Sequence, residues 1–343
     1  MNSTLTLAAE WDSRVNAVMI AYPAPHTDWG YMLEEARQCF DNIIAALACQ
    51  CNIKVIIVGD YHTLRKRLGS KGLFNNNIAV LDVEYNDTWA RDFGPLTLTD
   101  DSGNIVYLDF KFNGWGMKYA ANLDNQVCNA LANLPLIHAP IKNYQDFVLE
   151  GGSIETDGKG TLLTTTGCLL SPNRNGAFSQ EQIEEQLKQR LGAKRVLWIN
   201  NGELEGDDTD GHIDTLVRMA DEHTLAYVRC DNMMDSHFHS LSAMERELRQ
   251  LTDAEGNPYN LVALPMPSPV YDDDSNRLPA TYANFLILPH NVLLPVYNQP
   301  ENDRKAIDTL RSIFPQKTVI PIDCNALIKQ HGSLHCVTMQ MIL

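Results

Sequence analysis

The chain has 343 residues, of which 44% are hydrophobic and 20% charged, so it can bury a sizeable core and is not an intrinsically disordered chain. Its net charge of -16 disfavours nucleic acid and anionic membrane as partners and favours cationic small molecules. Eight cysteines at this length are too sparse for a disulfide scaffold and are expected to be reduced thiols.

The segment from Met1 to Arg14 lacks the basic start, apolar core and cleavage site of a signal peptide, and no apolar run reaches the length of a membrane span. We therefore expect a cytoplasmic protein without nucleic-acid or membrane partners. Homo-oligomer formation is left open by the sequence.

Short β-rich runs alternate with helical stretches along the chain. The predicted strands are Val15 to Tyr22, Ile53 to Val58, Ile78 to Val83, Ile105 to Phe110, Gly160 to Thr165, Arg195 to Ile199, Thr224 to Arg229, Asn284 to Leu288 and Thr318 to Pro321. The predicted helices are Tyr31 to Cys49, Ser179 to Leu191, Ser240 to Leu251 and Glu301 to Phe314. In the second helix, Ser179 and Gln182 have the spacing of a capping box.

This alternation predicts an α/β fold, and a doubly wound sheet fits the pattern almost as well as a set of repeats. No low-complexity linker divides the chain, and the proline-rich piece from Leu264 to Pro279 is interpreted as a loop. We expect a single domain covering residues 1–343.

The segment EGDDTDGHID, Glu205 to Asp214, packs five acids around one histidine. If it is a strand, His212 and Asp214 face the same side, because side chains alternate along a strand. A calcium loop is excluded by spacing, and the chain lacks the paired histidines or cysteines that would complete a zinc site, so no metal is expected.

Four other segments place polar residues where apolar runs end. They are NDTWARDFGP (Asn86 to Pro95), FNGWGMKY (Phe112 to Tyr119), EGGS (Glu150 to Ser153) and HGSLHC (His331 to Cys336). The first three follow strand-like runs, so their side chains are expected to project past the ends of strands. Their glycines allow the main chain to approach a ligand closely.

Together with GDDTDGHID and HCVT, these segments match the motifs of the agmatine deiminases in type and order, from Trp11 to nearly the last residue. The chain therefore resembles that family, within the wider group of peptidylarginine deiminases, arginine deiminases and amidinotransferases. The resemblance implies the pentein fold, a five-bladed pseudo-symmetric α/β propeller of ββαβ units around a central channel. It also implies hydrolysis of agmatine to N-carbamoylputrescine and ammonia in polyamine biosynthesis, without a cofactor.

The resemblance further implies a catalytic set consisting of Cys336, His212, Asp92, Asp214 and Glu150. A guanidinium carbon is a poor electrophile, so a thiolate nucleophile and fixed orientation of the plane are both needed. The two aspartates would hold the guanidinium edges through charge-assisted hydrogen bonds. His212 would protonate the departing ammonia and later deprotonate water, with Glu150 holding the imidazole.

The ammonium tail of agmatine calls for an acid or an aromatic face, whereas arginine calls for a cation to bind its carboxylate. By the resemblance, Asp208 is predicted to bind the tail, Trp89 to pack on the methylene chain and Trp115 to form a wall of the cavity. Three alternatives stay open: a deiminase of another arginine-type guanidine such as peptidylarginine, a non-catalytic binding protein of the same fold, and a Cys-His amide hydrolase with an oxyanion hole.

Several neighbouring residues are given structural interpretations. His335 would point away from the site if its segment is extended, and Arg91 would be a buried ion-pair partner. Asp207 and Asp210 are expected to be solvated or bonded to the backbone. Where the family often has three glycines in a row, this chain has His331 and only one glycine, so its backbone approach to the substrate is an open point.

Overall fold

The computed structural model describes residues 4–343, whose strands form six open sheets. In sheet order, the strands are β1 (Thr6–Leu7), β5 (Leu96–Thr99), β6 (Ile105–Lys111) and β7 (Ile141–Val148); β10 (Arg195–Ile199), β9 (Thr161–Thr165) and β8 (Ile154–Thr156); β11 (Val217–Met219), β12 (Thr224–Arg229) and β13 (Asn260–Pro265); β14 (Val270–Tyr271) and β15 (Arg277–Leu278); β16 (Leu286–Ile287), β17 (Asn291–Val296) and β18 (Thr318–Asp323); and β19 (Met339–Met341), β2 (Ala17–Ala21), β3 (Lys54–Val58) and β4 (Ile78–Leu81).

The longer helices are α1 (Leu33–Ala45), α2 (Tyr61–Ser70), α5 (Asp124–Leu131), α8 (Gln180–Leu191), α9 (Phe238–Leu248) and α10 (Pro300–Ile313). Single turns form α3 (Ala90–Phe93), α4 (Gly114–Met117), α6 (Thr166–Leu169), α7 (Pro172–Asn175) and α11 (Asn325–Ile328). Three 3-10 turns, η1 (Asp28–Met32), η3 (Gly151–Ser153) and η4 (Ile213–Thr215), and a π-helical turn, η2 (Ala46–Gln50), complete the set.

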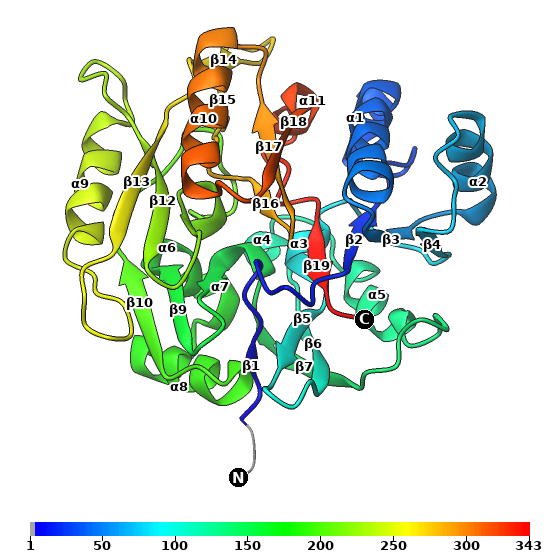
Figure 1. The fold of residues 1–343 in the computed structure, drawn as a ribbon, viewed down its shortest axis with the longest axis horizontal. Coiled ribbons are helices and arrows are strands. Elements are labelled where there is room, and N and C mark those ends of the chain that lie inside the picture. The colour runs from blue at the N-terminus through cyan, green and yellow to red at the C-terminus, as the bar shows by residue number, and fades with distance from the viewer. Residues whose placement is uncertain (1–3) are drawn as a thin grey trace.

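Five of the six sheets repeat one arrangement, an antiparallel pair followed by a helix and a parallel strand. The parallel pairs of this arrangement are β2 with β3, β6 with β7, β9 with β10, β12 with β13, and β17 with β18, and β3 also pairs in parallel with β4. A parallel pair requires a crossover, and a helix supplies it in each case. Figure 1 shows α1, α8, α9 and α10 around the outside of the molecule, with the strands toward its middle.

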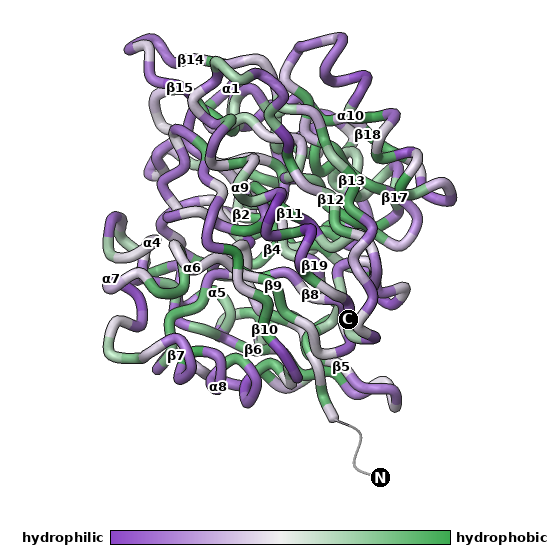
Figure 2. Tube along the Cα trace, turned by 90° about the vertical axis from the view of Figure 1, so that its left-hand side faces the viewer, coloured by the Kyte–Doolittle hydropathy of each residue, from purple (hydrophilic) through white to green (hydrophobic). Residues whose placement is uncertain are grey.

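Local sequence explains these elements. All five residues of β2 are buried, as expected of a parallel strand covered on both faces. Helix α8 begins with the predicted capping box of Ser179 and Gln182 and ends at Gly192, whose φ of 67° is the left-handed conformation that glycine adopts easily. Figure 2 shows the interior strands mostly apolar and the outer helix α8 mostly polar.

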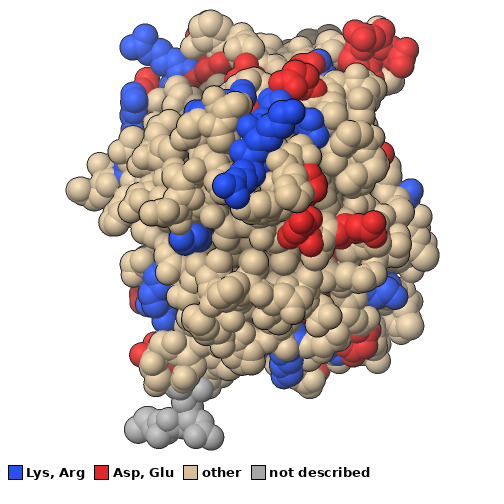
Figure 3. All heavy atoms as spheres, turned by 90° about the vertical axis from the view of Figure 1, so that its right-hand side faces the viewer, with Lys and Arg blue, Asp and Glu red and all other residues tan. Residues whose placement is uncertain are grey.

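The α/β expectation is confirmed, and all nine predicted strands and four predicted helices lie on observed elements. Prediction missed helices α2 and α5 and several strands, among them β5, β7, β13 and β17, and the proline-rich piece interpreted as a loop contains the hairpin of β14 and β15. No helix in residues 4–343 is both long and apolar enough to cross a membrane. On the face that carries α2, basic and acidic groups lie interspersed (Figure 3).

Candidate active site

The predicted catalytic residues come from four short turns at strand ends. Asp92 lies in α3, Glu150 directly precedes η3, and His212 and Asp214 begin and occupy η4. Cys336 lies in a turn just before β19. All five side chains are buried.

Gly152 marks the point where three of these side chains converge. A Cβ atom added there would lie 2.6 Å from His212 Nδ1, 2.9 Å from Asp92 Oδ1 and 3.0 Å from Asp214 Oδ2. The second glycine of EGGS therefore leaves room for a histidine and two carboxylates to meet.

Both oxygens of Asp92 accept hydrogen bonds. Gly152 N donates to Oδ1 and Trp115 Nε1 donates to Oδ2, each at 2.9 Å. His212 Nδ1 lies 3.7 Å from Oδ1. Burial raises the pKa of Asp92 to about 6, with His212 opposing the shift and Asp214 adding to it.

Asp214 has one occupied and one free oxygen. Its Oδ2 lies 2.7 Å from His335 Nδ1 and 3.9 Å from Cys336 Sγ, whereas Oδ1 is buried without a hydrogen-bond partner. Burial opposes ionisation, but His335 and His212 outweigh it and lower the pKa of Asp214. Asp214 is therefore a carboxylate with one oxygen available to a donor.

Asn284 holds the turn that carries the cysteine. Its Oδ1 accepts from His335 N at 2.8 Å and Cys336 N at 3.3 Å, and lies 3.4 Å from Cys336 Sγ. Its Nδ2 donates to the carbonyl of Asp214 at 3.3 Å. Sequence reasoning missed this residue, which belongs to no recognised motif.

His212 is buried among acceptors, and its Nε2 has no hydrogen-bond partner. Burial opposes a charge on the ring, but Asp92 and Glu150 outweigh it, and the pKa of His212 is raised well above its ordinary value. The imidazolium can therefore act as a proton donor.

Glu150 lies beside His212, but its hydrogen bonds go elsewhere: Arg174 Nε donates to both carboxylate oxygens at 2.8 and 3.0 Å. Ligand atoms of Glu150, Cys168 and His212 lie within 4.8 Å of one another, close enough for a metal ion. The Arg174 guanidinium already neutralises Glu150, which disfavours a cation there.

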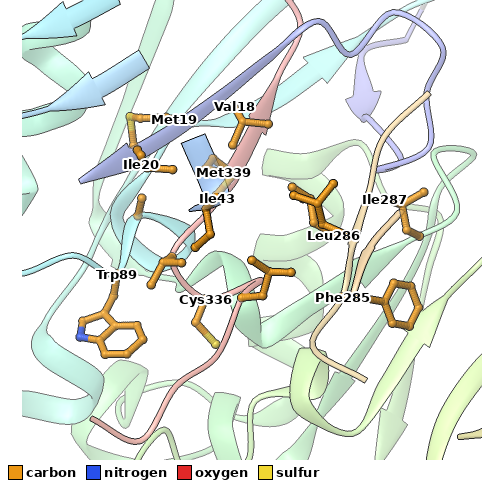
Figure 4. Packing of buried hydrophobic residues seen from close by; sticks show 14 of the residues in the cluster. Val18, Met19, Ile20, Ile43, Trp89, Phe285, Leu286, Ile287, Cys336 and Met339 are labelled. Carbon is orange, nitrogen blue, oxygen red and sulfur yellow. The ribbon is translucent and has the colours of Figure 1, made fainter. Parts of the chain in front are cut away.

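A cavity opens over Cys336, with about 390 Å³ of unfilled space that includes the part open to solvent. It is lined by Asp28, Asp87, Trp89, Asp92, Trp115, Tyr119, Asp208, Thr209, Gln330, His331, Gly332 and Cys336. The lining contains four aspartates and no lysine or arginine. In Figure 4, Cys336 and Trp89 lie at the edge of the buried apolar cluster.

The predicted substrate-binding residues all line this cavity. Trp89 and Trp115 are buried and in edge-to-face contact, with ring centroids 6.3 Å apart. Asp208 is half-buried, and Tyr119 donates to its Oδ2 at 2.8 Å. Burial raises the pKa of Asp208, and the Tyr119 hydrogen bond opposes the shift. Asp28, Asp87 and Tyr119 were not predicted, although Asp87 lies in the NDTWARD motif.

The sequence profile of the Porphyromonas-type peptidyl-arginine deiminase family matches residues 6–341. The chain belongs to this family. A Vibrio parahaemolyticus protein provisionally described as an agmatine deiminase is 32% identical, covering 95% of this chain and 94% of its own.

Two solved structures of similar proteins align with almost the whole of this chain. A Porphyromonas gingivalis protein provisionally described as an arginine deiminase is 45% identical, with a TM-score of 0.90 and 98% of each chain covered. A Cys-to-Ser variant of the C. jejuni agmatine deiminase, solved with substrate bound, is 33% identical, with a TM-score of 0.90, covering 99% of this chain and 97% of its own.

Two local predictions for this deiminase family member are wrong. The segment from Glu205 to Asp214 is not a strand, because it consists of turns that end in η4. His212 and Asp214 meet because the turns fold back, not because of strand alternation. The segment before β19 is likewise a series of turns, so strand alternation does not determine the direction of the His335 side chain.

The interpretations of neighbouring charged residues are mostly confirmed. Arg91 Nη2 is buried 3.7 Å from Glu10 Oε2, and Asp207 accepts hydrogen bonds from the backbone of Thr209 and Gly211. Asp210 differs, because it pairs with Arg174 at 2.6 Å and with Lys118 at 2.8 Å.

The departure from the glycine run of the deiminases is accommodated locally. His331 adopts a φ of 65°, a conformation that favours glycine, and its Nδ1 donates to the carbonyl of Gly206 at 2.7 Å. Gly332 preserves a close approach of the backbone to the Trp89 ring, because a Cβ there would lie 2.1 Å from Trp89 Cζ3.

Gly332→Ala is therefore expected to push the Trp89 indole out of place. We expect a loss of about 1–3 kcal/mol in unfolding free energy from overpacking, together with a raised KM for the substrate. Gly69→Ala is the matched control, since a Cβ there meets nothing within 4 Å and α2 tolerates alanine. Equal denaturation midpoints and KM values for the two variants would contradict this account of Gly332.

The pH dependence of cysteine labelling reports on the empty site. Burial, Asp214 and Asp92 raise the pKa of the Cys336 thiol well above its ordinary value, so thiolate is scarce at neutral pH. Alkylation by iodoacetamide should accelerate about tenfold per pH unit between pH 7 and 9. Peptide mass spectrometry measures the rate, with exposed Cys49 as an internal check of reagent. A rate that is already constant at pH 7 would refute the raised pKa.

Proposed function

We propose that this protein hydrolyses the guanidinium group of agmatine to N-carbamoylputrescine and ammonia. The observation that carries the proposal is the cavity over Cys336, lined by four aspartates and two tryptophans with no lysine or arginine. Such a lining suits a dication with an apolar middle and offers nothing to a free carboxylate. The similarity to agmatine deiminases over almost the whole chain supports the same reaction.

Binding prepares the nucleophile. A guanidinium between Asp92 and the free Oδ1 of Asp214 places a positive charge beside Cys336, which offsets the carboxylates that raise the pKa of the thiol. The thiol then releases its proton to solvent, and the thiolate attacks the guanidinium carbon to give a neutral tetrahedral adduct.

His212 moves the remaining protons. Its imidazolium donates a proton to one amino group of the adduct, the C–N bond breaks, and ammonia leaves a cationic thiouronium on Cys336. The neutral imidazole then accepts a proton from water as the water oxygen bonds to carbon. The C–S bond breaks with its electron pair returning to sulfur, the hydroxyl proton of the adduct passes to the thiolate, and the neutral ureido product departs with the thiol restored. Glu150, which is hydrogen-bonded to Arg174, adds to the effect of Asp92 in raising the pKa of His212.

The alternative substrate is an arginine side chain within a peptide, which also lacks a free carboxylate, and the family description favours it. Ammonia release and ureido product should be measured in parallel on agmatine, free arginine and a blocked arginyl peptide. Faster turnover of the blocked peptide than of agmatine would overturn the proposed substrate. Release from none of the three would favour a non-catalytic binding protein.

The tail site is tested with Asp208→Asn. Losing a charge-assisted bond to the ammonium should weaken agmatine use by about 1–3 kcal/mol in kcat/KM. Butylguanidine, which has no amine, should be nearly unaffected in the same variant. An equal loss on both substrates would mean that Asp208 shapes the loop and that the tail binds elsewhere.

We also propose the wider organisation of the protein. The five repeats of an antiparallel pair, a helix and a parallel strand support a five-bladed pseudo-symmetric propeller formed by a single domain. The eight free cysteines support work in the reducing cytoplasm.

A further inference from the structure

Behind Asp214 lies a chain of buried charged side chains that the mechanism above does not use. His335 bridges two carboxylates: its Nδ1 is 2.7 Å from Asp214 Oδ2, and its Nε2 is 2.6 Å from Glu10 Oε2. His335 is 1% exposed, Asp214 0% and Glu10 6%. Glu10 comes from the segment between β1 and β2 and belongs to no motif in the site.

The two carboxylates fix the protonation of the ring. Burial opposes ionisation of Glu10, but Arg218 and His335 outweigh it and hold the pKa of that carboxyl well below its usual range. Asp214 is likewise ionised. Carboxylates accept hydrogen bonds, so both contacts are made when each ring nitrogen of His335 donates, that is, when the ring is an imidazolium.

Other charged side chains surround the ring. Arg218 Nη2 donates to the same Glu10 oxygen at 2.9 Å, which brings it to 3.1 Å from His335 Nε2. Arg218 Nε donates to Glu155 at 2.6 Å, and Arg91 lies 3.7 Å from Glu10. With a charged His335, three cations face the three carboxylates of Glu10, Glu155 and Asp214, so the buried cluster is neutral.

We propose that His335 is a positioning residue for the reaction: held as an imidazolium by Glu10, it fixes the rotation of Asp214 and keeps it ionised. Asp214 Oδ2 is then permanently engaged, and Oδ1 is left for the guanidinium. This rests on the proposed function, since it assigns Asp214 to substrate. Of these two adjacent residues, Cys336 is the nucleophile and His335 aligns the carboxylate of Asp214.

The functional test compares His335→Gln and Glu10→Gln with wild type on agmatine. A glutamine amide cannot donate to both carboxylates and carries no charge. In His335→Gln, kcat should fall about 100-fold, as for a misplaced reacting group. Because Asp214 can still bind the guanidinium but is no longer held in one rotation, KM should change much less than kcat.

Glu10→Gln leaves the His335 imidazole hydrogen-bonded to Asp214, so kcat should also fall, but by a smaller factor than in His335→Gln. A purely structural role would lower the amount of folded enzyme, measured by thermal denaturation, and leave kcat per folded molecule unchanged. His223→Gln is the control, because His223 also pairs with a carboxylate, Asp253 at 2.7 Å, but lies outside the cavity lining and this chain of charges. A kcat per folded molecule that is unchanged in His335→Gln would overturn the proposal.

A second measurement does not depend on agmatine turnover. In ¹⁵N-histidine spectra of the wild-type protein at the pH of the activity assay, with His335→Gln used for assignment, both ring nitrogens of His335 should carry protons. A neutral ring at that pH would overturn the proposal. If wild type fails to hydrolyse agmatine while His335 is an imidazolium, the proposed function fails and the arrangement of charges stands.

Discussion

Cys336→Ser and Cys336→Ala are expected to lower agmatine turnover by on the order of 10⁴-fold or more, as removal of the nucleophile does in other covalent hydrolases. The fold and agmatine affinity should change little, because the carboxylates supply ground-state binding. Steady-state rates, circular dichroism and titration calorimetry measure the three quantities.

The covalent step has its own signature. Acid quenching during turnover should trap an amidino group on Cys336, detected by peptide mass spectrometry, and most readily in His212→Ala if that variant can still form the adduct. Cys49→Ser, which changes an exposed thiol, should behave as wild type. Activity of wild-type order in Cys336→Ser would refute the mechanism.

Asp92→Asn and Asp214→Asn should reduce kcat by about 10²-fold or more, whereas Asp208→Asn should act mainly on KM. At position 92 an amide cannot accept from both Gly152 N and Trp115 Nε1, so the side chain must rotate as well as lose its charge. At position 214 it would weaken the pairing with His335.

The comparison requires kcat and KM for agmatine and butylguanidine in each variant. Both substrates should lose turnover when either inner aspartate is changed, because both present a guanidinium. Asp273→Asn, in an exposed turn, is the matched control for loss of one negative charge. If kcat is retained in Asp214→Asn, the guanidinium is not oriented by that carboxylate.

The alternation of strands and helices could be predicted because most strands here are short apolar runs. Strands β10 and β12 were predicted to the residue. Strand β7 was missed because it is an edge strand whose first six residues are half-buried or exposed, and β17 because Pro295 interrupts its apolar run. Propensity says little where a strand is exposed or contains proline.

The candidate residues were predicted from motifs, but their partners were not. Glu10 meets His335 across 325 positions, and Asn284 meets Cys336 across 52. No local periodicity encodes a contact at such separations. The orientation of the His335 side chain could not be predicted either, because it depends on a series of turns and not on a strand.

The pairing of β19 with β2, and of His335 with Glu10, has a consequence during synthesis. A nascent chain carries Glu10 and β2 early, yet their partners emerge only after every intervening element has been translated. Until then Cys336 has not been made, so the segment from Glu205 to Asp214, with His212 and Asp214, lacks the nucleophile. Contacts of such long sequence separation form late and slowly, so the sheet of β2, β3 and β4 has an unpaired edge at β2 until β19 is made. We therefore expect catalytic competence to appear abruptly on release from the ribosome, which pulsed translation with timed ammonia assays would reveal.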